Sequence, residues 1–255
     1  MATMTGKRGL MEMLRAEGVK YIFGNPGTSE GPILDALEDY PDLKYMLTSQ
    51  EGAAMGMADG YARATGKPAF VNLHIETGLA NGLSLLHNAK EGGPPMVVTS
   101  ANKEFRKLTE GRSGLAEMVR LFGKWRAEEA DPAQIPSVMR RAFTEAKTPP
   151  TGPVYVGFSA NALDGETDAE IASSPSRYHH TAPDRRAIED ATRLLASASD
   201  PVVLVGDRVG ESGAAREAAR IADALGAPVL SPLPISRCRP SYAHTPPSSP
   251  APTPH

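Results

Sequence analysis

The alternation of short apolar runs with segments of helical spacing limits this chain, more than any other feature, to an α/β fold. Six strands are predicted, at Val19–Phe23, Leu43–Leu47, Pro68–Leu73, Pro95–Thr99, Lys124–Ala127 and Pro153–Gly157. Helical patterns separate most of them, which favours a doubly wound, mostly parallel six-stranded sheet with helices on both faces. The runs Leu43–Leu47 and Pro95–Thr99 are apolar enough that we expect both strands to be buried.

The pattern divides the 255 residues into four segments. Residues 1–160 form the first domain, and residues 161–184 form a polar linker without periodicity. Residues 185–239 hold two further helices and two strands, about half of what a second α/β domain needs. Residues 240–255 are rich in proline and have no apolar face, so we expect disorder there. A frameshifted or truncated end explains this abrupt change better than a proline-rich docking tail.

Composition narrows the class of protein. A net charge of −3 gives no reason to expect nucleic acid or an anionic membrane as a partner. The single cysteine, Cys238, excludes an internal disulfide framework and fits a reducing compartment. The sequence holds no apolar run near the ~20 residues that a membrane span needs. We therefore expect a cytoplasmic protein.

Three polar crossings between a strand and a helix lie at one predicted edge of the sheet. They are Gly24–Ser29, Gln50–Glu51 and His74–Gly78. In parallel sheets ligands bind outside the carboxyl ends of the strands, where these crossings fall. Glu51 begins a helix, where free N–H groups and the helix dipole favour a charged carboxylate. A purely structural role at the start of its helix also explains Glu51. Thr28 or Ser29 is available as the cap of the helix predicted to follow them, where helical spacing resumes at Ile33.

Four motifs in this order resemble the thiamine diphosphate enzymes. They are Gly-Asn-Pro-Gly-Thr at 24–28, Gln-Glu-Gly-Ala-Ala at 50–54, Ala-Asp-Gly-Tyr-Ala-Arg at 58–63 and Asn-Leu-His at 72–74. They are similar to the N-terminal, pyrimidine-binding domain of the acetolactate synthase and pyruvate decarboxylase superfamily. Asn-Pro-Gly-Thr and Asn-Leu-His are closest in type to members like benzoylformate decarboxylase. The resemblance covers about residues 5–239.

The resemblance implies roles for particular residues. In the family a glutamate hydrogen-bonds a pyrimidine nitrogen of the cofactor and favours the tautomer that deprotonates the thiazolium carbon; Glu51 matches it. His74 matches a histidine that moves protons at the substrate, although a histidine bonded to a loop carbonyl is the structural alternative. Thr28 matches a hydroxyl that reaches the substrate carboxylate, with a helix cap as its alternative. The cofactor-binding set is Pro26, Gly27, Glu51, Gly78 and Asn81, of which Gly78 and Asn81 also suit a helix start.

Some family features are missing or altered. Glu76 stands where small residues are expected, and its charge could repel an anionic substrate. The family holds the diphosphate and Mg²⁺ in a C-terminal domain with a Gly-Asp-Gly motif. Ala58-Asp59-Gly60 lies inside a predicted helix, and Gly206-Asp207-Arg208 has the wrong third residue. No metal site is therefore assigned, and we expect weak cofactor binding or none by this chain alone.

Two classes of function stay open at this point. The first is a lyase or carboligase acting on 2-keto acids, in which this chain is a fragment or one subunit. It would then work as a homo-oligomer or with a separate diphosphate-binding chain. The second is a folded, non-catalytic product without turnover of its own. No recognisable motif identifies the 2-keto acid. None distinguishes decarboxylation from carbon–carbon ligation.

Overall fold

The computed structural model describes residues 3–104, 111, 113–175 and 182–231. The chain forms two compact units, Met1–His180 and Thr181–His255, and each is described by itself. Cys238 and the expected disordered tail at 240–255 lie outside the described residues. Within the described residues, no helix is long and apolar enough to cross a membrane.

The first unit is built on a parallel six-stranded sheet with the strand order β3-β2-β4-β5-β7-β6. Its strands are β2 (Tyr21–Asn25), β3 (Lys44–Leu47), β4 (Ala69–Leu73), β5 (Met96–Asn102), β6 (Trp125–Glu129) and β7 (Pro153–Ser159). All six predicted strands are present, each within a few residues of its expected bounds. The predicted doubly wound α/β fold is therefore confirmed.

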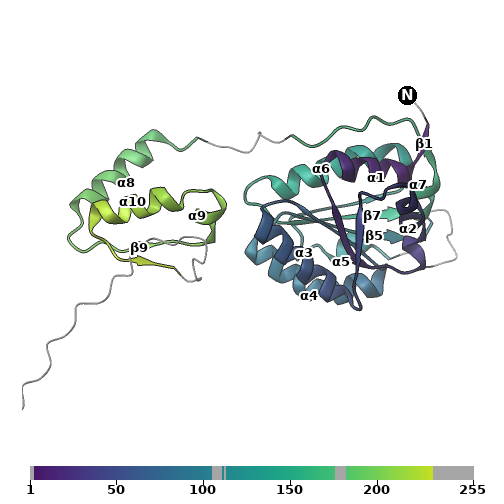
Figure 1. Cartoon of the computed structure of the whole chain (residues 1–255), viewed down its shortest axis with the longest axis horizontal. Helices are drawn as coiled ribbons and strands as arrows, with labels where there is room; N and C mark the ends of the chain where they lie inside the picture. The colour runs from purple at the N-terminus through teal and green to yellow at the C-terminus, as the bar shows by residue number, and fades with distance from the viewer. Residues whose placement is uncertain (1–2, 105–110, 112, 176–181, 232–255) are drawn as a thin grey trace, which may run out of the picture. The chain divides into compact units, whose positions relative to one another are not determined.

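Helices cover both faces of this sheet (Figure 1). One face carries α1 (Gly6–Ala16), α2 (Gly31–Ala36), α6 (Ile135–Lys147) and α7 (Ala160–Asp164). The other carries α3 (Glu51–Thr65), α4 (Glu76–Gly92) and α5 (Leu115–Met118). Short 3-10 turns, η1 (Thr28–Glu30), η2 (Leu37–Asp39) and η3 (Pro132–Gln134), join some of these elements.

Alternation along the strands supplies both cores. Ile22 and Phe70 belong to the core under α1 and α6, while their neighbours Phe23 and Val71 belong to the core under α3 and α4. This is the two-residue period of a strand that is covered on both sides. Every residue of β5 is buried, as expected from its apolar run.

The expectation that the run before Glu51 is a buried strand was wrong. β3 is an edge strand of the sheet, and Leu47 at its end is 72% exposed. An apolar run predicts a strand but does not encode its place in the strand order. An edge position leaves one side of β3 without a neighbouring strand, which accounts for its exposure.

After β7 the chain folds back onto the first unit. α7 follows directly, and β8 (Glu166–Thr167) pairs antiparallel with β1 (Met4–Thr5). Ser174 is then held by Glu17 at the end of α1, because the Ser174 N–H and hydroxyl both donate to the Glu17 carboxylate. The Lys147 ammonium donates to the same carboxylate at 3.1 Å. Much of the segment expected as a linker therefore packs on the first unit.

The second unit is a small layer of helices on a two-stranded parallel sheet. Its elements are α8 (Arg185–Ser197), β9 (Val203–Leu204), α9 (Asp207–Glu211), α10 (Ala215–Leu225) and β10 (Val229–Leu230). The two predicted helices and two predicted strands occur in the expected order, and the short helix α9 between β9 and α10 was not predicted. Several large apolar side chains stay exposed on it, among them Ile188, Leu194, Val202, Leu204 and Leu230.

Candidate active site

The predicted polar crossings meet at the carboxyl edge of the sheet. β2 and β4 are neighbours, in register from Ile22↔Phe70 to Asn25↔Leu73. The connection from β2 leads to β3 on one side, and the next strand, β4, is added on the other side of β2. Such a reversal of strand order is the usual place for a ligand crevice in a doubly wound sheet.

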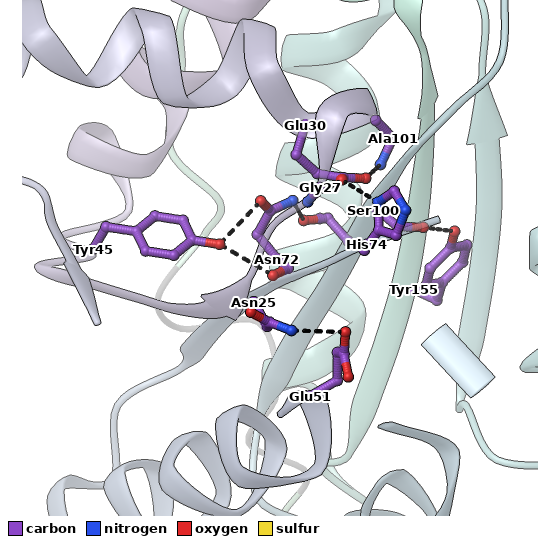
Figure 2. A network of polar contacts seen from close by, with 11 residues as sticks. Asn25, Gly27, Glu30, Tyr45, Glu51, Asn72, His74, Ser100, Ala101 and Tyr155 are labelled. Carbon is purple, nitrogen blue, oxygen red and sulfur yellow. Dashed lines mark hydrogen bonds and ion pairs between the residues drawn. The ribbon is translucent and has the colours of Figure 1, made fainter. Parts of the chain in front are cut away.

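Glu51 is the first residue of α3 and is only 7% exposed. The helix starts here because the Gln50 side chain accepts a hydrogen bond from the Ala53 N–H. Two amides hold the Glu51 carboxylate from different elements. Asn25 Nδ2, at the end of β2, donates to Oε1 at 3.0 Å, and Asn81 Nδ2, on α4, donates to Oε2 at 3.0 Å. Figure 2 shows the contact with Asn25.

The pKa of Glu51 lies below its ordinary value. Burial alone raises it, but several other effects together outweigh burial: the hydrogen bond from Asn81, one from the backbone, one from Asn25 and the nearby charge of His74. Glu51 is therefore a charged, acceptor-only group at neutral pH. It is held on the rim by fixed donors.

His74 follows β4 and lies on the same rim. Its Nδ1 is 2.9 Å from Oε2 of Glu30, and its side chain is 29% exposed. Two glycines leave room for it. A Cβ built on Gly27 would lie 2.1 Å from Nδ1, and one on Gly78 would lie 2.8 Å from the His74 Cβ. Gly78 lies between the two predicted catalytic residues, His74 and Glu51, because the same added Cβ would lie 3.0 Å from Glu51 Oε1.

The turn after β2 brings Pro26 and Gly27 to the rim, half-buried, and leaves Thr28 exposed. The expectation that Thr28 or Ser29 caps the next helix was wrong. α2 begins at Gly31 with Glu30 in the N-cap position, and neither Gly27, the N-cap residue of η1, nor Glu30 caps its own helix with a side-chain bond. The Thr28 hydroxyl is thus not engaged as a cap.

Glu76 stands in the first turn of α4, where the Ser113 hydroxyl donates to Oε1 at 2.6 Å. This hydrogen bond lowers the pKa of Glu76, burial opposes it, and the charges of Lys103 and His74 lower it further. Glu76 therefore adds a second charged carboxylate near His74, on the side of Ser113.

Two groups at this site were missed from the sequence. Glu30 is completely buried and bonded to His74, and Asn25 is a donor to Glu51. Asn25 stands inside the Gly24–Ser29 turn, so its place at a strand end was a usable signal. Glu30 stands near the start of a helix, where a glutamate is ordinarily solvated, and nothing local marks it as buried.

No metal ligand set is present in the described part of the chain, where no group of three or more His, Cys, Asp or Glu side chains is placed to hold an ion. Asp59 lies within α3 and pairs with Arg63 at 2.9 Å. Asp207 opens α9, which has only five residues.

Comparisons with known proteins agree with this geometry. Residues 4–121 match the family model described as thiamine pyrophosphate enzyme, N-terminal TPP binding domain. The chain is 33% identical to a benzoylformate decarboxylase of Pseudomonas aeruginosa over 89% of this chain and 44% of the relative. It is 31% identical to a probable acetolactate synthase large subunit of Methanocaldococcus jannaschii, over 93% of this chain and 42% of the relative.

Solved structures give the same picture. The thiamine diphosphate-dependent 4-hydroxybenzoylformate decarboxylase of Rhodococcus jostii RHA1 has a TM-score of 0.79 and 30% identity, over 89% of this chain and 44% of that one. Benzoylformate decarboxylase of Polynucleobacter necessarius has a TM-score of 0.81 and 26% identity, over 89% and 43%. The chain thus spans less than half the length of these relatives.

Proposed function

Given that this chain belongs to the thiamine pyrophosphate enzyme family through its N-terminal TPP-binding domain, we propose that its rim binds the aminopyrimidine of thiamine diphosphate for chemistry on a 2-keto acid. The observation that carries the proposal is Glu51, a buried carboxylate held in its charged form between two amide donors. The decarboxylase or carboligase activity of a complete enzyme is part of this proposal.

The residues of the rim fit an aminopyrimidine. Glu51 offers a charged acceptor to a ring nitrogen that carries a proton, and Gly27 and Gly78 leave space that a Cβ would fill. Bound thiamine diphosphate supplies a carbon nucleophile and an electron sink for the bond beside a keto group. We propose that Pro26, Gly27, Gly78 and Asn81 line or support the pyrimidine position.

The chain's own residues have separate tasks in this proposal. Glu51 holds a proton at the pyrimidine nitrogen, with its orientation set by Asn25 and Asn81. His74 exchanges a proton with the substrate through the ring nitrogen that faces away from Glu30. The exposed Thr28 hydroxyl binds the substrate carboxylate. Glu76, also charged, disfavours substrates with a second anionic group near Ser113.

We propose that the diphosphate and Mg²⁺ are held outside the described residues of this chain, by a diphosphate-binding region of a second copy or of another polypeptide. Exposed residues on α3, the helix that begins with Glu51, support an interface with that region. Met57 on α3 is 42% exposed, and Ala53, Gly56 and Gly60 form an exposed strip of small residues beside it. The alternative is a folded protein that turns nothing over.

The test uses ligand pieces of increasing size. The free aminopyrimidine fragment, thiamine, and thiamine diphosphate with Mg²⁺ are titrated into the chain and followed by backbone amide shifts and calorimetry. We expect the fragment to shift the amides of Gly27, Glu51 and Gly78, and Glu51→Gln to abolish those shifts. Glu17→Gln, at the end of α1, is the matched control and should bind like the wild type.

Adding a diphosphate-binding domain from a relative should raise the affinity for the whole cofactor. Turnover of a 2-keto acid by that mixture would exclude the non-catalytic alternative. Amide shifts at the rim that are equal in Glu51→Gln and wild type would overturn the assignment of the pyrimidine position.

A further inference from the structure

Glu30 is a buried carboxylate that joins the carboxyl ends of three strands. It is 0% exposed, and its two oxygens lie within hydrogen-bond distance of three groups: one in the turn after β2, one directly after β4 and one near the end of β5. The Gly27 N–H donates to Oε2 at 3.0 Å, and the Ala101 N–H donates to Oε1 at 3.0 Å. The third partner is His74 Nδ1, 2.9 Å from Oε2 (Figure 2).

The donors fix the direction of the bond to His74. A backbone N–H can only donate, so Gly27 and Ala101 both need acceptor oxygens on Glu30. Both oxygens of Glu30 thus act as acceptors, and a carboxylate has no hydrogen of its own to donate. The remaining contact is then complete only if His74 Nδ1 carries a hydrogen and donates it to Oε2.

The His74 ring has little freedom to turn away from this contact. Gly27 lies against Nδ1 and Cε1, since a Cβ there would be 2.1 and 2.3 Å from these atoms. On the other side Gly78 lies against the His74 Cβ. A ring flip would exchange Nδ1 for a carbon at the Glu30 contact and would leave the buried carboxylate without its third donor, which is unfavourable.

We propose that Glu30 is a positioning residue that holds His74 in the tautomer with hydrogen on Nδ1, so that Nε2 is the proton-exchanging nitrogen. In this arrangement the hydrogen on Nδ1 of neutral His74 stays on the ring and is hydrogen-bonded to Glu30. His74 then takes or gives a proton at Nε2 alone. Glu30 accepts this hydrogen bond throughout and touches no substrate. The functional meaning of this arrangement rests on the role proposed above for His74, but the tautomer itself does not.

Nitrogen-15 spectroscopy of the imidazole tests the proposal on the chain as it exists. Long-range correlations from the ring protons are recorded at a pH where the ring is neutral, and His74→Asn assigns the signal. In the wild type we expect Nδ1 at the pyrrole-type end of the nitrogen range and Nε2 at the pyridine-type end. Glu30→Gln should invert this pattern or average it, because an amide can donate to Nδ1.

Glu17→Gln is the matched control, because Glu17 is also a buried carboxylate, with 2% of its side chain exposed. Its bonds go to Ser174 and Lys147, away from His74. This variant should keep the wild-type tautomer even if it loses as much stability as Glu30→Gln. A general loosening of the fold would move both variants alike, which separates positioning from a purely structural role.

Each result decides the question. Hydrogen on Nε2 in the wild type overturns the proposal at once, and this measurement needs no variant to fold. An unchanged tautomer in a folded Glu30→Gln also overturns it. If the aminopyrimidine fragment fails to bind while the tautomer behaves as expected, the proposed function fails and the positioning role stands.

Discussion

Asn81 Nδ2 lies 3.0 Å from Glu51 Oε2, although Asn81 is on the exposed side of α4 and Glu51 is buried at the start of α3. This bond joins the two helices that follow β3 and β4. It is a surface-accessible donor on a buried anion, so it can be removed without opening a cavity in either core.

Asn81→Ala should reduce stability in a pH-dependent way. The folded-state pKa of Glu51 is below its ordinary value of 4.5, so its ionisation stabilises the fold above that pH, and this contribution is lost as the pH falls through the folded-state pKa. Removing a charge-assisted hydrogen bond should cost roughly 1.5 kcal/mol at pH 7 and progressively less as the pH is lowered below 4.5. Urea unfolding over this pH range measures the change, with Ser84→Ala on the same helix as control. A loss of stability that does not change with pH would contradict the charged state of Glu51.

Glu51→Gln should lower the rate of hydrogen–deuterium exchange at the reactive carbon of thiamine diphosphate. Loss of the negative charge removes general acid–base assistance, typically worth about 10²–10⁴-fold. The measurement needs the chain together with a diphosphate-binding domain. Asp59→Asn, a carboxylate of the same helix paired with Arg63, should leave the rate unchanged. Exchange as fast in Glu51→Gln as in wild type would reduce Glu51 to a helix-start residue.

Gly78→Ala should disturb both predicted catalytic side chains together. Its Cβ would lie 2.8 Å from the Cβ of His74 and 3.0 Å from Glu51 Oε1, so one of them must move. Overpacking of this kind typically costs about 1–3 kcal/mol. Chemical unfolding gives the stability, and the histidine nitrogen spectrum reports the ring. Gly31→Ala, where a Cβ meets nothing within 4 Å, is the control. A Gly78→Ala protein with unchanged stability and spectrum would show that the rim is looser than the geometry indicates.

Met57→Lys should weaken self-association of the chain. Met57 is exposed on α3, and a charge there would be buried by a second copy packed on α3 and α4. Sedimentation over a range of concentrations should show a dissociation constant raised by about tenfold or more, equivalent to 1.4 kcal/mol. Leu34→Lys, on the opposite face of the sheet, should sediment like the wild type. A wild type that stays monomeric at every concentration would exclude this interface.

The sheet and most of the rim residues could be predicted from the sequence, because both depend on local patterns. Apolar runs predicted all six strands, and the crossings after them placed Gly27, Glu51 and His74 on one edge. The edge position of β3 could not be predicted in this way. Strand order follows from how crossovers pack, and Leu47 is as apolar as a residue of a central strand.

The contacts of Glu30 and the amide partners of Glu51 could not be predicted from local patterns. The bond from Ala101 to Glu30 spans 71 positions, and the bond from Asn81 to Glu51 spans 30. Burial of Glu30 depends on β5 and on the loop after β4, which are far away in sequence. Only the assembled sheet brings donors from three strands to one carboxylate.

The three-strand junction at Glu30 also bears on how the rim forms during folding. A partly folded chain in which β5 has not yet joined β4 lacks the Ala101 donor. Forming this contact closes a loop of 71 positions between Glu30 and Ala101, which has an entropic cost. An unpaired carboxylate in a closed interior is unfavourable, so such a form keeps Glu30 in water and the turn after β2 unfixed. Docking of β5 on β4 therefore completes the binding edge at the same moment as this part of the core. Native-state amide exchange should find the Gly27 and Ala101 protons opening in one cooperative unit.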